Sequence, residues 1–220
     1  MSFFDQIEII HTKFNSIRLT SFKKLRNYRL SQKHFTIISN NCWGGMVYQA
    51  YNLKKQSPTV GTFFYAPEYI VFLQNYKKAL NGEIEFIRPE QSRYWEVLRC
   101  RKDGCSFPIG VLPGGSEICF LHYKSEDEAQ RKWQRRCKRI NWDKMIFKFN
   151  DQNLCTEKEI VAFDSLDVDN KLLFTCKDWG INKKHYIKIY QFPKNNCIRF
   201  SWEPFCDSIY LNLTKMINNL

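Results

Sequence analysis

Apolar residues near the start of the chain recur at the three- and four-residue spacing of a helix: Phe3, Ile7, Ile10, Phe14 and Ile17. Basic residues gather toward the second half of the same segment: Lys13, Arg18, Lys23, Lys24, Arg26 and Arg29. The pattern predicts a basic amphipathic helical segment over residues 1–31. Such a helix either lies against the rest of the fold with a solvated basic face or contacts an anionic membrane surface.

Further along, short apolar runs typical of buried strands alternate with segments of helical period. The strand-like runs are 35–39, 60–64, 84–87, 118–121, 145–149 and 171–175, with late candidates at 185–190 and 198–202. The helical segments are 46–53, 68–80, 125–139, 156–163 and 209–217. Alternation of this kind predicts a three-layer α/β/α fold with a mostly parallel, Rossmann-like central sheet. Residues 88–116 interrupt it and are expected to form a loop or hairpin insertion in a single domain spanning 1–220.

The composition is that of a globular protein, and its charge raises the question of an anionic partner. Of 220 residues 44% are hydrophobic, and the formal net charge is +12. That charge suits nucleic acid, a phospholipid surface or a phosphorylated small molecule. No apolar run approaches the ~20 residues that cross a bilayer, and no signal-peptide pattern opens the chain. The nine Cys form no repeated framework. We therefore expect a cytoplasmic protein, membrane-peripheral if its basic helix contacts lipid.

Polar residues follow several predicted strands, and parallel sheets bind their ligands at the carboxyl ends of strands. The candidates are Asn40, Asn41, Cys42, Trp43, Gly44, Gly45, His122, Lys124, Lys148, Asp151 and Lys177. Gly44 and Gly45 lead into a helix, where backbone N–H groups can approach a phosphate. The spacing matches neither the dinucleotide fingerprint nor the P-loop, so a tight structural turn remains the alternative.

The candidate catalytic residues are the few polar residues at these strand ends that can accept or donate a proton. His122, Lys124 and Asp151 are the candidate acids and bases, while Lys148 and Lys177 are placed to neutralise phosphates. Each could instead be an ordinary structural or solvated residue. Cys42 and His122 could also form a thiolate–imidazole pair that carries acyl groups, the alternative being that Cys42 only packs.

Metal and nucleic-acid sites are not expected. Cys100 and Cys105 flank a turn, but no second Cys or His pair stands at zinc-ligand spacing. Asp167-Val168-Asp169 has the letters of a metal-binding motif, yet it precedes a strand and so lies at the wrong edge of the sheet. The basic run 132–139 would spread its charges around a helix rather than form one nucleic-acid footprint.

Four separated motifs resemble a bacterial family of unknown function whose members are often labelled exopolysaccharide or capsule biosynthesis proteins. They are FTIISNNCWGG (35–45), SPTVG (57–61), FLHYKS (120–125) and RINWD (139–143), and the resemblance covers about residues 30 to 180. Where the family favours an acidic residue and a His around the 118–121 strand, this chain has Gly115 and Cys119. Neither position is therefore a catalytic candidate here.

The resemblance implies work on surface glycans, which are assembled from nucleotide-activated sugars. The leading expectation is a metal-independent glycosyltransferase that needs no cofactor, takes a nucleotide sugar as its donor, and acts on a glycan or a lipid-linked glycan acceptor. Two alternatives remain open: a Cys42/His122 acyltransferase or hydrolase acting on glycans, and a non-catalytic module that binds a glycan or a protein partner.

Overall fold

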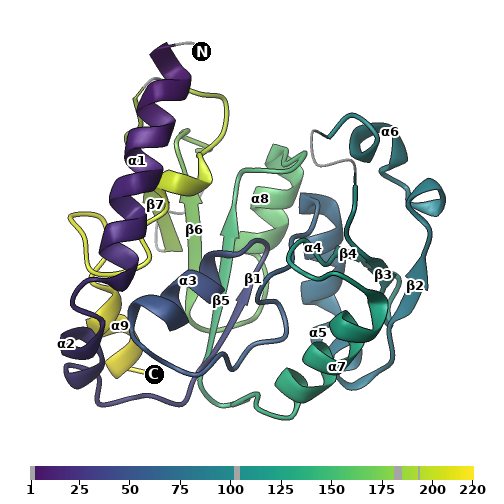
Figure 1. The fold of residues 1–220 in the computed structure, drawn as a ribbon, viewed down its shortest axis with the longest axis horizontal. Coiled ribbons are helices and arrows are strands. Elements are labelled where there is room, and N and C mark those ends of the chain that lie inside the picture. The colour runs from purple at the N-terminus through teal and green to yellow at the C-terminus, as the bar shows by residue number, and fades with distance from the viewer. Residues whose placement is uncertain (1–2, 102–104, 181–184, 193) are drawn as a thin grey trace.

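A four-stranded parallel sheet forms the centre of the computed structural model, which describes residues 3–101, 105–180, 185–192 and 194–220. Its strand order is β1-β5-β6-β7. The strands are β1 (Thr36–Ser39), β5 (Met145–Asn150), β6 (Lys171–Thr175) and β7 (Tyr186–Lys188). Ser39 lies opposite Lys148 in the register, so the polar residues that follow β1 and β5 meet at one edge. The expected α/β fold with a parallel sheet is confirmed (Figure 1).

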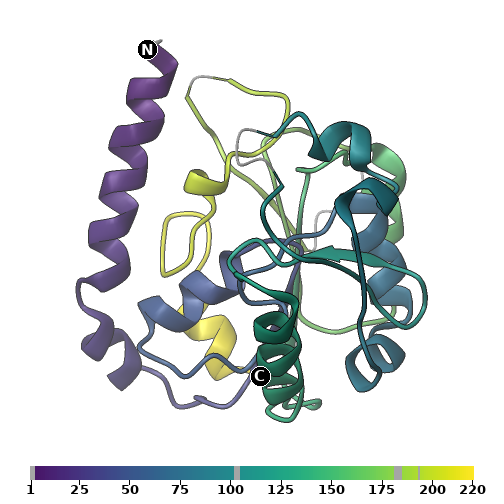
Figure 2. The same ribbon diagram turned by 45° about the vertical axis from the view of Figure 1, so that its right-hand side comes forward.

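Helices cover both faces of this sheet (Figures 1 and 2). The helices of the described residues are α1 (Phe3–Thr20), α2 (Lys23–Tyr28), α3 (Trp43–Ala50), α4 (Ala66–Gln74), α5 (Tyr76–Asn81), α6 (Trp95–Leu98), α7 (Glu126–Cys137), α8 (Glu157–Asp164) and α9 (Leu213–Asn218), of which α6 packs beside the antiparallel strands instead. Successive strand residues enter different hydrophobic clusters, because side chains alternate between the faces of a sheet. Ile37 joins a cluster with α3 and α9, whereas Ile38 joins one with α4 and α8.

A second, antiparallel sheet of order β2-β3-β4 lies beside the parallel one. Its strands are β2 (Glu85–Ile87), β3 (Ile109–Val111) and β4 (Glu117–Cys119). The prediction that His122 and Lys124 follow a strand of the parallel sheet is therefore wrong, since β4 belongs to this smaller sheet. The expected strand at 60–64 is also absent, and only an isolated bridge joins Phe63 to Cys119.

The segment predicted as an insertion, 88–116, holds a 3₁₀ turn (Pro89–Gln91), α6 and β3. The expected turn at 102–104 lies outside the described residues. β3 pairs with β4, so the hairpin extends beyond residue 116 into the strand that precedes His122.

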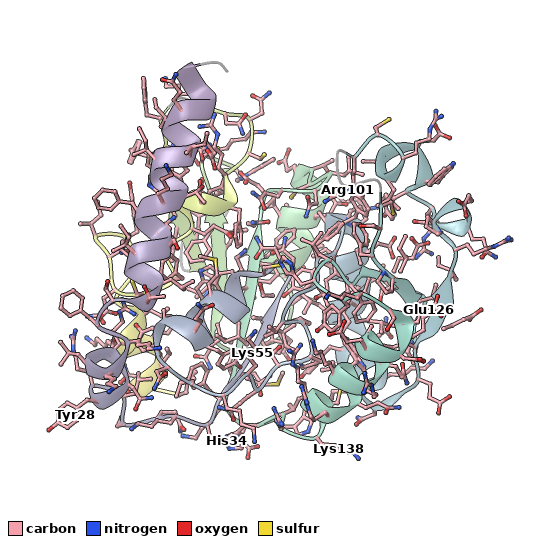
Figure 3. All side chains as sticks on the ribbon, in the orientation of Figure 1. Tyr28, His34, Lys55, Arg101, Glu126 and Lys138 are labelled. Carbon is pink, nitrogen blue, oxygen red and sulfur yellow. The ribbon has the colours of Figure 1, made fainter. Side chains whose placement is uncertain are left out.

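Local sequence sets the helix boundaries. The Ser125 side chain accepts a hydrogen bond from the Glu128 N–H and caps α7, whose ends are marked by Glu126 and Lys138 in Figure 3. The single helix expected over 68–80 is two helices, because Asn75 leaves helical geometry at φ −125°. Its amide donates to the Val71 carbonyl, a local bond by which Asn competes with the helix backbone.

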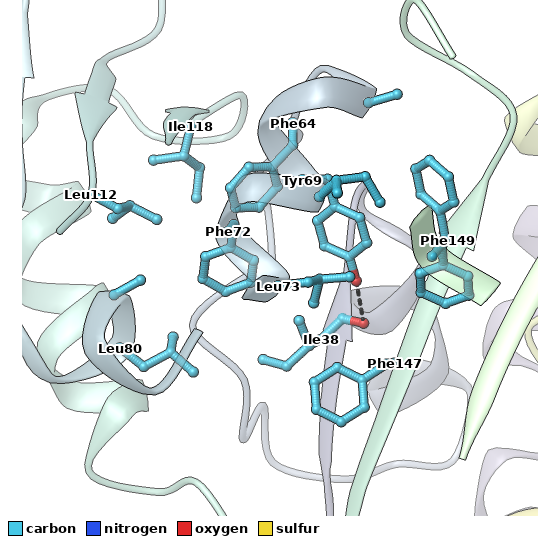
Figure 4. Packing of buried hydrophobic residues seen from close by; sticks show 14 of the residues in the cluster. Ile38, Phe64, Tyr69, Phe72, Leu73, Leu80, Leu112, Ile118, Phe147 and Phe149 are labelled. Atoms are coloured by element: carbon cyan, nitrogen blue, oxygen red, sulfur yellow. Dashed lines mark hydrogen bonds between the residues drawn. The ribbon is translucent and has the colours of Figure 1, made fainter. Parts of the chain in front are cut away.

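Aromatic rings fill the layer between α4 and the sheet (Figure 4). Tyr69 is fully buried, and its hydroxyl lies 3.0 Å from the Ile38 carbonyl and 2.9 Å from the Lys148 carbonyl. Its ring stacks on Phe149 at 5.5 Å between centroids. Tyr69 therefore fixes α4 to both β1 and β5.

A buried ion pair ties the C-terminal part of the chain to the carboxyl edge of the parallel sheet. Lys148 Nζ lies 2.5 Å from Glu203 Oε1, and both side chains are fully buried. Burial lowers the pKa of Lys148, while the Glu203 carboxylate opposes that shift. The lysine also donates to Asn40 Oδ1 at 3.3 Å and to Asn41 Oδ1 at 2.9 Å.

Amide side chains complete the hydrogen bonding around this pair. Asn41 and Asn150 each donate to Glu203, at 2.9 and 2.7 Å. Asn40 donates to Asn150 Oδ1 at 2.7 Å, and Gln152 donates to the Ile198 carbonyl at 2.6 Å. Buried charges are tolerated where partners of this kind satisfy them. The network therefore holds residues 198–203 against the ends of β1 and β5.

Loss of the buried carboxylate is expected to destabilise the whole fold. Glu203→Gln leaves the Lys148 charge unpaired in a water-excluded site, and breaking a buried pair in this way costs about 3 kcal/mol or more. Urea unfolding measures the change. The control is Glu83→Gln, because Glu83 is exposed and should tolerate the substitution with little effect. A Glu203→Gln protein as stable as wild type would contradict this role for the ion pair.

Candidate functional site

The candidate site is a cavity of about 220 Å³ between the first turns of α3, the loop 55–61 and α7. Its lining residues are Cys42, Gly45, Met46, Gln49, Lys55, Val60, Gly61, His122, Tyr123, Lys132 and Arg136. Figure 3 labels Lys55 in the region between α3 and α7. Three of the eleven residues that the sequence singled out, Cys42, Gly45 and His122, thus line one cavity together.

Two glycines allow the walls of the cavity to approach each other. Gly61 has φ +82°, and a Cβ there would lie 3.2 Å from the Tyr123 ring and 3.5 Å from His122 Cβ. The His122 N–H donates to the Gly61 carbonyl at 3.1 Å. A Cβ at Gly45 would lie 3.0 Å from Val60 Cγ1, so α3 packs closely on the loop. Both positions favour glycine, and the contact they permit brings His122 beside the start of α3.

Three cationic side chains line this cavity. Arg136 is 6% exposed, and its Nη1 donates to the Val60 carbonyl at 2.8 Å and to the Tyr123 hydroxyl at 2.5 Å. The Nε of Arg136 is buried without a hydrogen-bond partner. Lys132 pairs with Glu128 at 2.5 Å. A buried donor without a partner is costly, so an acceptor that reaches Arg136 Nε would be stabilising.

The charges in the cavity are all of one sign. No Asp or Glu is among its described lining residues. Burial lowers the pKa of Lys55, and the nearby Arg136 and Lys132 cations lower it further. A group whose charged form is disfavoured by neighbouring cations gains stability when an anion binds beside it. The cavity therefore has the electrostatics of a phosphate or carboxylate site.

Cys42 lines this cavity in surroundings that favour its neutral thiol. Burial raises the pKa of Cys42 to about 11, and the Lys148 charge only partly offsets that shift. Its sulfur lies 3.8 Å from the Thr62 carbonyl, to which the thiol donates. An activated nucleophile would instead show a pKa below that of a free thiol. The environment of Cys42 thus favours packing over chemistry.

The first turn of α3 also serves the packing of the fold. The Trp43 N–H donates to Asn41 Oδ1 at 3.1 Å, so one N–H at the start of the helix already has an acceptor. A Cβ at Gly44 would lie 3.1 Å from Ile37 Cγ2, and Trp43 donates through its ring to the Pro204 carbonyl at 2.9 Å. Gly44 and Trp43 therefore face the sheet and the C-terminal segment rather than the cavity.

The other predicted residues lie outside the cavity lining. Lys148 is committed to Glu203, and Asp151 accepts hydrogen bonds from the Thr175 hydroxyl at 2.6 Å and the Ile198 N–H at 2.7 Å. Burial raises the pKa of Asp151. Lys177 stands over the Trp179 ring, 5.1 Å from its centroid. These side chains, with Asn40 and Asn41, lie at the carboxyl edge of the sheet and in the segments packed on it. They do not line the cavity.

Lys124 faces a different hollow, which it lines with residues of the antiparallel sheet and the start of α7. It follows His122 by two positions, so the chain turns one side chain into the basic cavity and the other away from it. The structure therefore does not place His122 and Lys124 together.

Sequence reasoning missed the three cavity cations. Lys132 and Arg136 stand four residues apart, which places them on the same side of a helix. That spacing was a usable signal within the basic run 132–139, whose charges were expected only to spread around the helix. Lys55 stands in a loop next to Lys54, and no local pattern distinguishes the two lysines.

Three further features bear on earlier expectations. Among the described residues, no group of three His, Cys, Asp or Glu side chains could hold a metal ion. Asp167-Val168-Asp169 lies just before β6, at the amino edge of the sheet, as the sequence predicted. Within the described part of the chain, no helix is both long and apolar enough to cross a membrane.

Two comparisons with known proteins each match most of the chain. An uncharacterised protein of Haemophilus influenzae is 32% identical over 169 residues, which cover 76% of this chain and 74% of that protein. The model of a family described as a domain of unknown function, DUF1919, matches residues 13–219. The match includes α2, the cavity and the C-terminal segment that carries Glu203. The chain therefore belongs to the DUF1919 family of domains of unknown function.

Proposed function

We propose that this protein is a glycosyltransferase that binds the phosphates of a nucleotide sugar in the basic cavity without needing a metal ion. The observation that carries the proposal is the grouping of Lys55, Lys132 and Arg136 around a cavity whose described lining residues include no carboxylate. Cations in a partly closed site can stabilise the negative charge that develops on a departing diphosphate. The acceptor, a bacterial surface glycan or its lipid-linked precursor, rests on the motif resemblance alone.

In this proposal each lining residue has a defined task. The acceptor hydroxyl attacks the anomeric carbon of the sugar, and the bond between that carbon and the phosphate oxygen breaks. His122 takes the hydroxyl proton, and the bonding electrons leave on the nucleoside diphosphate. Lys55 and Arg136 hold that diphosphate. A cavity of about 220 Å³ suits a diphosphate, so the nucleoside and the sugar would extend beyond it.

The proposed phosphate contacts differ from those expected on sequence alone. Lys148 was expected to neutralise a phosphate, but its charge is paired with Glu203 and buried. Lys177 lies beside Trp179, away from the cavity lining. We therefore assign the phosphate to Lys55 and Arg136, while Lys132, which pairs with Glu128, adds a third cation to the cavity lining.

Neutralising Lys55 is expected to weaken binding of the donor. Calorimetry against uridine, guanosine and cytidine diphosphate sugars should identify one that binds, and Lys55→Gln should lower its affinity about tenfold, since a charge-assisted hydrogen bond is worth ~1.5 kcal/mol or more. The control is Lys54→Gln, which removes a neighbouring lysine that is exposed as Lys55 is but lies outside the cavity lining, and it should bind as wild type does. Equal losses in both variants, or no binding by any of these sugars, would count against the proposal.

A Cys42/His122 acyltransferase or hydrolase is the second candidate, because both side chains line the same cavity. A pKa of about 11 leaves almost no thiolate at neutral pH, which argues against it unless a bound acyl donor changes the site. A screen with coenzyme A esters and oligosaccharides separates the candidates by the ligand that stabilises the fold. Binding of an oligosaccharide without turnover would favour the third alternative, a glycan-binding module.

Replacing Cys42 tests the two reaction classes directly. With the donor identified by calorimetry, Cys42→Ser should retain most turnover because the oxygen keeps the shape of the site. His122→Ala should lose most of it, since removing a general base commonly costs 10²-fold or more. Initial rates measure both effects. Complete loss in a folded Cys42→Ser protein, together with an acyl adduct trapped on wild-type Cys42, would replace the glycosyltransferase proposal by the acyl-transfer one.

A further inference from the structure

Most apolar side chains of the first two helices face solvent, while Leu19 packs partly buried against the core. Ile10, Phe14 and Ile17 lie on one side of α1, and each is at least 60% exposed. Phe22 and Tyr28, at the start and end of α2, are 74% and 85% exposed. Figure 1 shows the two helices along one side of the molecule, and Figure 3 shows Tyr28 pointing away from it. We call these five residues and Leu25 the N-terminal apolar patch.

Polar side chains occupy the opposite, inward side of α1. Glu8 accepts a hydrogen bond from the Ser201 hydroxyl, and Asn15 donates to the Ser201 carbonyl. His11 stacks on Trp202 with 4.0 Å between ring centroids. The arrangement is the reverse of an ordinary surface helix, which turns its apolar side inward.

The same reversal continues into α2. Arg26 turns inward, where it donates to the Ser21 carbonyl at 2.6 Å and to the Ala50 carbonyl. Leu25, its neighbour, is 55% exposed. Phe22 adopts φ +56°, a left-handed conformation that bulky side chains rarely take, and its ring is directed outward. An exposed apolar patch that includes a strained backbone at Phe22 indicates contact with an apolar partner outside the described fold.

The charged residues around the patch indicate the chemical class of that partner. Lys13, Lys23 and Lys24 are exposed among its apolar residues. A second copy of the chain would bring these lysines against their own counterparts, on a protein of net charge +12. An anionic bilayer instead offers a hydrocarbon boundary for the rings and phosphate headgroups for the lysines.

We propose that α1 and α2 bind the surface of an anionic phospholipid membrane, with the N-terminal apolar patch in the headgroup region and Lys13, Lys23 and Lys24 on the lipid phosphates. The helices lie along the surface. This inference rests on residues outside the basic cavity, so it stands or falls separately from the proposed function.

Vesicle flotation tests the proposal on the full chain. Wild type should float with vesicles containing phosphatidylcholine and roughly one third phosphatidylglycerol, should not float with phosphatidylcholine alone, and should dissociate as salt rises. Phe14→Ser/Ile17→Ser and, separately, Lys13→Gln/Lys23→Gln/Lys24→Gln should each lower the partition coefficient at least tenfold. Because all five side chains are exposed, both variants should keep the wild-type melting temperature.

Matched variants distinguish the patch from general attraction to a basic protein. Lys77→Gln/Lys78→Gln/Lys138→Gln removes the same charge from exposed sites on α5 and beyond the end of α7, and Ile209→Ser removes an apolar residue that is 95% exposed. Both should bind vesicles as wild type does. The proposal is overturned if wild type does not float, if the two lysine triples lose binding equally, or if Phe14→Ser/Ile17→Ser floats normally and instead dissociates a dimer in light scattering.

Discussion

The Lys148–Glu203 ion pair is the contact on which the arrangement of both chain ends depends. Glu203 reaches the sheet from a segment with little regular structure, and the asparagines after β1 and β5 hold its carboxylate in place. Ser201 and Trp202, next to Glu203, are among the groups that α1 contacts. The buried pair therefore positions the segment on which the first helix rests.

The Lys148–Glu203 pair also engages polar residues at the carboxyl edge of the sheet that would otherwise be available to a ligand. In an open parallel sheet, the carboxyl ends of the strands are the usual place for a ligand. Here Asn40, Asn41 and Lys148 use their hydrogen-bonding groups on one another and on Glu203. The open, cationic cavity lies to one side of that edge, where Gly45 lets α3 approach the loop before His122.

The sequence predicted those parts of the molecule that local pattern controls. Short apolar runs predicted β1, β5 and β6, and Ser125 as a capping residue predicted the start of α7. Whether the strand before His122 joins the parallel sheet is not a local property, since β4 pairs with β3 through a hairpin. Of the candidate site, Cys42, Gly45 and His122 were predicted. Lys55 and Arg136 were missed because they reach the cavity only through packing of a loop and a helix. Glu203 was missed for a similar reason, as a lone acidic residue near the C-terminus gives no sign that it will be buried against a lysine.

We propose that the cavity between α3 and α7 holds the phosphates of the ligand. The decisive measurement is a crystal structure of the protein with a nucleoside diphosphate. We expect the diphosphate within hydrogen-bond distance of Lys55 Nζ and Arg136 Nε, the latter gaining the acceptor that it lacks in the free protein. An ordered diphosphate beside Lys177 and Asp151 at the carboxyl edge, with the basic cavity unchanged, would show that the cavity is not the phosphate site.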